Sequence, residues 1–288
     1  MIIDLHIHSK TCSDGNLTVT QIIAEAKKRD IGLLSITDHD SIGCQKQAKT
    51  LAQKNQISYV NGVELNVTFS HPDYNKPVSL DFLGYQYDIN NPDLNKKLQE
   101  LAQHRQQRAI QILEKLNKEF EKHGIPKFTN KDLKNIQNSA DGALGRPHIA
   151  DYMIKQNIVT DRKEAFNTYL VKCNVPKFPL TLQEASKLIH NANGILVLAH
   201  PNDPYGTSLT KLTTELNEQT KIIQDKMLPH IDGVECWHSR NTPQTTNHYV
   251  AFAKKHNLTM TGGSDCHQKP VVMGTVKIPD FVAKQFIK

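Results

Sequence analysis

The segment Asp4-Leu-His-Ile-His-Ser-Lys-Thr-Cys-Ser-Asp-Gly15 places two histidines in alternation in an apolar run and then turns into a polar loop. Successive side chains of a β-strand point to opposite faces, so His6 and His8 are expected to share one face. Two neutral imidazoles aimed at one place favour a Zn, Mn or Fe ion, and Asp14 in the following loop offers a carboxylate to a second divalent ion. The alternative for this segment alone is a pair of histidines on the polar face of an ordinary strand.

The composition is that of a globular protein. The chain has 288 residues, enough for one large α/β domain or for one domain that carries an insertion. A hydrophobic fraction of 38% and a charged fraction of 22% are typical of globular domains. No stretch reaches the roughly 18 apolar residues of a membrane span, and the start lacks the pattern of a signal peptide. We therefore expect a cytoplasmic protein with no membrane partner.

The net charge and the cysteines limit further the class of protein and the partners to expect. A net charge of +6 suits an anionic substrate without requiring a nucleic-acid polymer, and double-stranded DNA is not expected as a partner. The five cysteines show neither CxxC spacing nor a paired framework. Free thiols are expected, rather than a zinc finger or a disulfide scaffold.

Strand and helix patterns alternate in both ends of the chain. Strands are expected at residues 2–8, 31–37, 57–65, 78–85, 194–200, 233–238 and 258–267. Helices are expected between them, at residues 18–29, 45–54, 181–191 and 245–256. This order favours an α/β fold with a parallel sheet or barrel.

Residues 93–171 have a different pattern. Apolar residues at helical spacing predict one long helix that ends near Gly124, a suitable C-cap with Pro126 shortly beyond it. Shorter helices are expected at residues 130–136, 146–156 and 161–171. We therefore predict a helical insertion, or cap subdomain, at residues 93–171, and an α/β barrel domain formed by residues 1–92 and 172–288.

Potential metal ligands occur in or just after the expected strands. They are His6, His8, Asp38, His39, Glu64, Asp81, His200, Glu235, His238, Asp265 and His267. In a β/α barrel the carboxyl ends of the strands form one face, and the active site lies there. We therefore expect these side chains to converge.

The motifs DLHIHS…SDG, TDHD, GVEL, LAHP and GGSDCH, in this order, resemble those of the PHP (polymerase and histidinol phosphatase) family of metal-dependent phosphoesterases. The helical insertion and the motif Arg146-Pro147-His148 are most similar to the branch that hydrolyses nucleoside 3′,5′-bisphosphates and trims short RNA from its 5′ end. The resemblance implies a distorted (β/α)7 barrel of the PHP type with an inserted all-helical cap.

The resemblance also implies two or three divalent ions, with Mn expected first and Zn, Fe or Mg as alternatives. One ion would be held by His6, His8, Glu64 and Asp265, with Glu64 bridging towards another, and the second by Asp14, His39 and His267. A third would lie between His200 and Asp81, where the family pattern has a histidine in place of the aspartate. Which ion His200 and His267 serve is left open.

The implied reaction is hydrolysis of phosphate monoesters, chiefly of the 3′-phosphate of nucleoside 3′,5′-bisphosphates, with short 5′-phosphorylated RNA as a second substrate. A metal-bridging hydroxide would attack the phosphorus. Arg146, with His148 beside it, would bind a phosphate at a helix start. His148 or His200 would protonate the leaving oxygen. The alternatives are a histidinol-phosphatase-like or other small-metabolite phosphatase, and a non-catalytic nucleotide-binding PHP module, which only Asp81 favours.

The remaining charged residues near these motifs keep two interpretations each. Asp4 and Asp38 would support ligating histidines, although Asp38 would equally serve as a helix N-cap. Glu235 and His238 are expected mainly at a solvated strand end. The basic residues at positions 104–108 form either a solvated helix face or a basic edge over the pocket.

Overall fold

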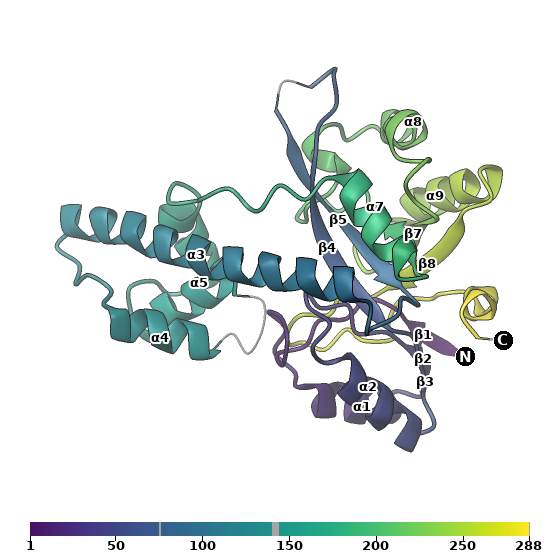
Figure 1. Ribbon diagram of the computed structural model, residues 1–288, viewed down its shortest axis with the longest axis horizontal. Coiled ribbons are helices and arrows are strands. Elements are labelled where there is room, and N and C mark those ends of the chain that lie inside the picture. The colour runs from purple at the N-terminus through teal and green to yellow at the C-terminus, as the bar shows by residue number, and fades with distance from the viewer. Residues whose placement is uncertain (75, 140–143, 288) are drawn as a thin grey trace.

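The computed structural model describes residues 1–74, 76–139 and 144–287, which form a mixed α/β fold with a helical lobe (Figure 1). In one sheet the parallel strands β1 (Ile2–Asp4), β2 (Ile31–Leu34) and β3 (Ser58–Tyr59) lie in that order. A second sheet has the order β4 (Gly62–Phe69), β5 (Val78–Tyr85), β6 (Ile195–Leu198), β7 (Gly233–His238) and β8 (Thr259–Gly263).

Isolated backbone bridges connect the two sheets. Ile7, which follows β1, forms a parallel bridge with Cys266, which follows β8. His39, which follows β2, forms another with Glu64 of β4. Both connections involve residues beside the expected metal ligands. The described ladders do not join the strands into the closed barrel that the resemblance implies.

Strand β5 differs from the expected parallel arrangement, because it runs antiparallel to both β4 and β6. The chain passes from β4 to β5 through a short connection with no helix, and such a hairpin reverses the strand direction. By contrast, β6, β7 and β8 are parallel, since helices connect them. The alternation of strands and helices therefore predicted the direction of these strands and missed that of β5.

Helices cover the sheets on their outer sides. Helices α1 (Val19–Lys28) and α2 (Gln45–Lys54) lie together beside β1–β3 (Figure 1). Helices α7 (Leu182–Asn191) and α9 (Pro243–Lys255) lie along the second sheet, and α8 (Leu216–Lys226) packs against α9. The short 3-10 helices η2 (Leu209–Lys211) and η3 (Asp280–Gln285) complete this part. Thr18 begins α1 in a capping box with Gln21, which satisfies backbone N–H groups at the helix start.

The 31-residue helix α3 (Pro92–Lys122) belongs to two hydrophobic clusters. Leu94, Leu98 and Leu101 pack in the cluster of the second sheet. Further along, Leu116 and Phe120 pack in a separate cluster. The elements of that cluster are α4 (Asn130–Ser139), α5 (Arg146–Lys155), α6 (Arg162–Ala165) and the π-helix η1 (Phe166–Leu170). They form the lobe that extends from the sheets in Figure 1.

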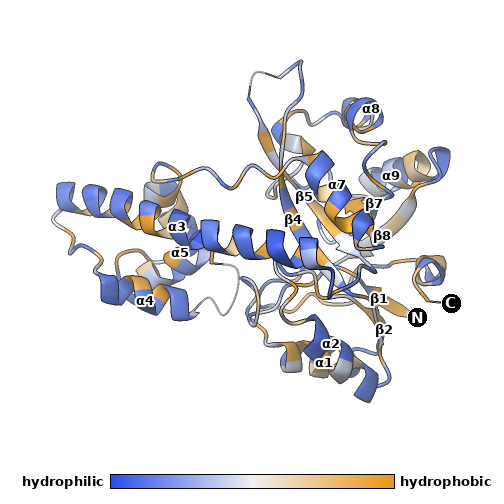
Figure 2. Cartoon of the chain, in the orientation of Figure 1, coloured by the Kyte–Doolittle hydropathy of each residue, from blue (hydrophilic) through white to orange (hydrophobic). Residues whose placement is uncertain are grey.

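Figure 2 shows the apolar residues concentrated in the strands and on the inner sides of the helices, whereas α3 is largely hydrophilic. Within the described ranges, no helix combines the length and the apolar character that crossing a membrane requires.

Gly263 at the end of β8 provides a test of this packing. A Cβ added there would lie 2.3 Å from Cβ of His6 and 2.4 Å from its backbone nitrogen, so only a shift of the backbone would relieve the contact. We predict that Gly263→Ala lowers the free energy of unfolding by about 1–3 kcal/mol in denaturant titrations, as overpacked sites do. The exposed control Lys28→Ala should change it by less than about 0.5 kcal/mol. Equal stability of Gly263→Ala and the wild type would contradict this close contact.

Candidate metal centre

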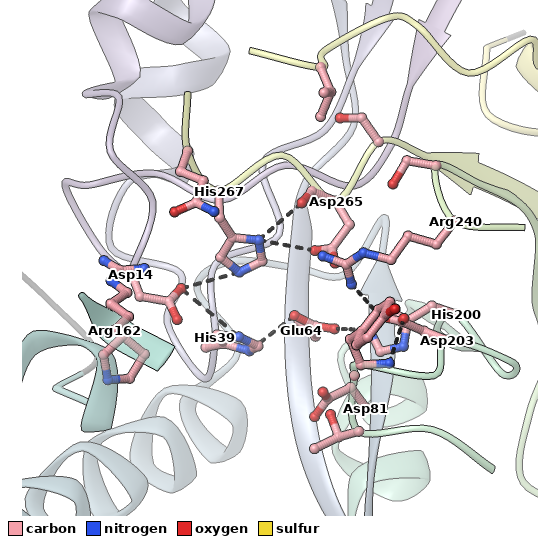
Figure 3. A pocket seen from close by; sticks show the side chains of 18 of the residues that line it. Asp14, His39, Glu64, Asp81, Arg162, His200, Asp203, Arg240, Asp265 and His267 are labelled. Carbon is pink, nitrogen blue, oxygen red and sulfur yellow. Dashed lines mark hydrogen bonds and ion pairs between the residues drawn. The ribbon is translucent and has the colours of Figure 1, made fainter. Parts of the chain in front are cut away.

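One open pocket of about 790 Å³ collects most of the expected metal ligands (Figure 3). The ligands that line it are Asp14, His39, Glu64, Asp81, His200, Asp265 and His267. They come from loops and strand ends that are far apart in the sequence. His6 and His8 are fully buried and contact the pocket through Glu64 and Asp265.

His6, His8, Glu64 and Asp265 form the first group. The Nε2 atoms of His6 and His8 lie 3.2 Å apart, because the extended backbone places both rings on one face. Glu64 approaches them with Oε1 3.4 Å from His6 Nε2 and Oε2 3.1 Å from His8 Nε2. Oδ1 of Asp265 lies 3.3 Å and 3.4 Å from the same two nitrogens. The structure thus brings together the four residues expected to hold one ion.

The second group contains Asp14, His39 and His267, with His8 beside them. Each of these residues offers one ligand atom within 4.8 Å of the others. Oδ1 of Asp14 lies 3.4 Å from Nε2 of His267 and 4.0 Å from Nε2 of His39. Nδ1 of His39 lies 3.0 Å from Oε2 of Glu64, so that carboxylate stands between the first and second groups.

The third group joins Glu64, Asp81 and His200. Nε2 of His200 lies 3.1 Å from Oε1 of Glu64. Asp81 is buried, and its carboxylate accepts a hydrogen bond from the Asn66 side chain. Burial raises the pKa of Asp81, and the nearby Glu64 carboxylate raises it further. Asp81 therefore lies where a third ion would bind, in surroundings that do not favour its negative charge unless a cation is present.

Unpaired buried atoms support the presence of cations in these groups. Among the described residues, the buried atoms without a hydrogen-bond partner include Nδ1 of His8 and Nδ1 of His200. Buried polar atoms without partners are costly, and few occur in native proteins. A mixed set of imidazole nitrogens and carboxylate oxygens suits Mn, Zn or Fe. The residues present therefore fit divalent metal ions.

The electrostatics of the centre lead to the same conclusion. Burial acts against protonation of His8, but hydrogen bonds to Asp265 and Glu64 outweigh it and raise the pKa of His8 to about 10. In the same way, burial is outweighed by Glu64 at His200, whose pKa rises to about 9. Burial also opposes ionisation of Glu64, yet His39 and His6 hold its pKa well below the usual range. Protons therefore occupy these imidazoles when no cation is bound, and metal binding should release them.

Glu235 and His238 are buried, so the expectation of a solvated strand end is wrong for both. Strand β7 lies between β6 and β8, and its end is therefore covered. Oε1 of Glu235 lies 3.1 Å from Nδ1 of His6, and Oε2 accepts the backbone N–H of His200 at 2.8 Å. Nε2 of His238 lies 3.6 Å from Oδ2 of Asp265. A carboxylate on the second ring nitrogen fixes the orientation of a ligating histidine. The sequence signal that could have indicated a role for Glu235 and His238 was their position at a strand end, where the expected metal ligands also lie.

Two further carboxylates near the centre, those of Asp38 and Asp4, accept hydrogen bonds from the backbone and so orient it. Asp38 accepts hydrogen bonds from the backbone N–H of Ser9 at 2.6 Å and from the Ser9 hydroxyl at 2.7 Å. It does not cap α2, which begins after Cys44. Asp4 accepts backbone N–H groups of Ser264 at 2.9 Å and of Gly274 at 2.8 Å. In the described part of the chain, neither carboxylate hydrogen-bonds to a histidine ring.

Cationic side chains surround the pocket. They are Arg146, Arg162, Lys177, Lys211, Arg240 and Lys269. Arg146 stands at the start of α5, 5.3 Å from the centre of the Phe166 ring, and pairs with no carboxylate among the described residues. Arg162, in contrast, forms two hydrogen bonds of 2.6 Å with Asp151.

The basic residues at positions 104–108 are not a solvated face. Arg105 forms an ion pair with Asp40, and Arg108 is buried. Nε of Arg108 donates to the carbonyl oxygen of Val175 at 2.6 Å. These contacts attach the middle of α3 to the rest of the chain, so the interpretation of a free basic edge is not supported either.

His148 does not reach the main pocket. Its Nδ1 accepts the backbone N–H of Gly145 at 3.1 Å and completes the cap of α5. Of the described residues, those beside it in a smaller adjacent pocket include Asp14, Asp151 and Arg162. The expected roles of His148 in proton transfer and substrate binding stay predictions, whereas Arg146 and His200 both line the main pocket.

We predict that His8→Ala and Asp265→Ala each lose at least one equivalent of bound Mn while they keep the wild-type circular dichroism spectrum, because both residues supply ligands rather than core packing. Elemental analysis after dialysis measures the metal. The control is His190→Ala, since His190 lies at the end of α7 and pairs with Asp232 at 2.7 Å. Full metal content in either variant would contradict the assignment of these residues as ligands.

Comparison with known proteins agrees with this centre. The family model of the PHP domain matches residues 4–193. The 5′-3′ exoribonuclease Rnm of Escherichia coli is 29% identical over 277 residues, which cover 93% of this chain and 86% of the relative. The 3′,5′-nucleoside bisphosphate phosphatase of Chromobacterium violaceum is 28% identical over 268 residues, which cover 92% of this chain and 87% of the relative.

The fold has solved counterparts as well. A structure from Bifidobacterium adolescentis, assigned to the metal-dependent phosphoesterases, matches with a TM-score of 0.81 at 25% identity and covers 99% of this chain and 95% of its own. A structure from Chromobacterium violaceum, described as an amidohydrolase with bound sulfate, matches with a TM-score of 0.79 at 27% identity. The match covers 98% of this chain and 93% of the chain in that structure. The chain belongs to the PHP domain family and is a metal-dependent phosphoesterase.

Proposed function

We propose that the protein removes the 3′-phosphate of nucleoside 3′,5′-bisphosphates and also shortens 5′-phosphorylated RNA from its 5′ end. The observation that carries this proposal is Arg146, a cation without a carboxylate partner among the described residues, in the same pocket as the metal ligands. A guanidinium in this position suits a second phosphate, apart from the one that reacts. The names of the relatives from Escherichia coli and Chromobacterium violaceum support RNA and bisphosphates as the substrates.

The three groups described above would hold the ions. His6, His8, Glu64 and Asp265 would hold the first, Asp14, His39 and His267 the second, and Asp81 with His200 the third, with Glu64 shared among them. When bound, divalent ions supply activation of a water molecule and neutralisation of phosphoryl charge. Mn is the ion that we expect first, because carboxylates outnumber imidazoles at the third site.

His200 has two roles that exclude each other. Its Nε2 would bind the third ion or would hold a proton for the leaving 3′ oxygen. In the metal-free protein, burial of His200 is outweighed by contacts with Glu64, which raise the pKa of the ring to about 9. Asp81 decides between the two roles, because a third ion needs its carboxylate.

We also propose that the two sheets form a distorted (β/α)7 barrel of the PHP type and that residues 93–171 form its cap subdomain. The bridges from Ile7 to Cys266 and from His39 to Glu64 support the barrel. The separate hydrophobic cluster of the lobe supports the cap. In this arrangement the cap carries Arg146 and Arg162 to the mouth of the pocket.

A single hydrolysis panel with added Mn tests the proposed function. It compares adenosine 3′,5′-bisphosphate, a short 5′-phosphorylated RNA, histidinol phosphate and p-nitrophenyl phosphate. We expect the highest kcat/KM for the first two substrates. Preferential hydrolysis of histidinol phosphate would favour the small-metabolite alternative, and turnover of p-nitrophenyl phosphate alone would overturn nucleotide specificity.

We predict that Arg146→Ala lowers kcat/KM for adenosine 3′,5′-bisphosphate by the equivalent of about 1.5–3 kcal/mol, the range for a charged hydrogen bond, and leaves p-nitrophenyl phosphate hydrolysis unchanged. Steady-state kinetics on both substrates measure this difference. Lys163→Ala, an exposed cation on the same lobe, is the matched control. Equal losses on both substrates would place Arg146 at the reacting phosphate, and no loss on either would exclude a role in binding.

A further inference from the structure

We propose that Tyr205 and Arg240 form a stacking platform for the base of the second nucleotide of a short RNA substrate. The inference rests on the proposed function and adds the direction in which the substrate lies in the pocket. It assigns the first nucleotide to the side of Arg146 and Arg162. It assigns the continuing RNA chain to the opposite side.

Tyr205 is an exposed aromatic residue at the metal pocket. Its exposed fraction is 85%, and it lines the same pocket as Glu64 and His200. The large hydrophobic residues that are exposed in the described ranges are Met1, Ile2, Val171, Tyr205, Phe281 and Ile287. Of these, Tyr205 is the one that lines this pocket. A ring with this exposure contributes little to the core, and the face not turned to Arg240 is accessible to a ligand.

The loop that carries Tyr205 is fixed by a buried carboxylate. Asp203 is 1% exposed, and its Oδ1 accepts the backbone N–H of Tyr205 at 3.0 Å. Its backbone oxygen accepts the Ser208 hydroxyl at 2.6 Å. A Cβ added to Gly206 would lie 2.6 Å from Oδ2 of Asp203, so glycine permits the close turn. The backbone at Tyr205 is therefore held in place by the loop, so little ordering of the backbone would be needed when a base binds.

Arg240 completes the platform. Its NH1 forms an ion pair with the Asp203 carboxylate, and its guanidinium lies 5.9 Å from the centre of the Tyr205 ring. One carboxylate thus fixes both the tyrosine backbone and the arginine. Aromatic rings and guanidinium planes stack on any base, because every base has a π face, and the positive charge also favours the RNA backbone.

Arg162 and Arg240 lie on opposite sides of the row of metal ligands (Figure 3). In Figure 3, Arg162 lies beside Asp14, whereas Arg240 and Asp203 lie beside His200. Between these ends runs a row of contacts from Asp14 through His39 and Glu64 to His200.

The chemistry of the proposed reaction gives this row a direction. The oxygen of water bonds to phosphorus, the bond from phosphorus to the 3′ oxygen of the first nucleotide breaks, and that oxygen takes a proton. With RNA, the phosphate remains on the 5′ oxygen of the second nucleotide. With a bisphosphate, it leaves as inorganic phosphate. Only RNA therefore has a base to place beyond the reacting phosphate, where Tyr205 lies.

The test compares two substrates that differ only in the second nucleotide, adenosine 3′,5′-bisphosphate and the 5′-phosphorylated dinucleotide pApA, with Mn-loaded protein. The quantity measured is the ratio of kcat/KM for pApA to that for the bisphosphate. Base stacking on one aromatic ring predicts a fall of about 5- to 100-fold in this ratio for Tyr205→Ala. Tyr205→Phe should keep the wild-type ratio, because the ring remains. Phe281→Ala, an exposed aromatic residue outside the pocket, is the matched control.

Three other outcomes would contradict the inference, and the kcat/KM values measured on the two substrates distinguish them. An unchanged ratio in Tyr205→Ala, with the wild type active on both substrates, overturns the platform and leaves the proposed function intact. Equal losses on both substrates would place Tyr205 at the first nucleotide and overturn the assigned direction. A wild type that hydrolyses neither substrate overturns the proposed function, and the platform with it.

Discussion

Backbone hydrogen bonds on both sides of the segment after β1 determine where the metal centre can form. On one side, Thr37 donates to the carbonyl oxygen of Ile7 at 2.8 Å. On the other, Asp265 donates to His6 at 2.8 Å and His8 donates to Cys266 at 3.1 Å. The segment therefore joins the loop that carries His39 to the loop near the end of the chain. Without these hydrogen bonds the two histidines would lose the carboxylates opposite them, because Asp265 follows β8 and Glu64 forms a bridge with His39, which follows β2.

Charge balance imposes the next constraint. The centre contains Asp14, Glu64, Asp81 and Asp265, and burial makes each carboxylate costly to ionise. Histidines hold the pKa values of three of them low, whereas that of Asp81 is raised. Asp81 relies on Lys177 and His39 for nearby positive charge, and these do not offset its burial. Occupancy of the third site should therefore depend most strongly on the metal supplied.

The sequence predicted the α/β class and the candidate metal ligands that line the pocket, because side chains at strand ends follow from the alternation of side chains and from motif order. It could not predict the direction of β5, since a pattern of period two is the same for either direction. Glu235 was underestimated because burial depends on which strands flank β7. The helix-capping contact of the His148 ring could not be predicted either, because proximity to Arg146 in sequence does not show where that ring points. Tyr205 carries no periodic signal at all.

The fold separates the groups that hold metal from those that we propose to select the substrate. The metal ligands lie on strand ends and their loops, while Arg146 and Arg162 lie on the lobe with its own hydrophobic cluster. Arg105 of α3 nevertheless pairs with Asp40, the residue next to His39. Because the same helix also packs in the cluster of the second sheet, the lobe is attached by buried contacts rather than by a flexible linker. A substitution in the lobe can thus change which phosphate ester binds, while the metal centre keeps its own supports.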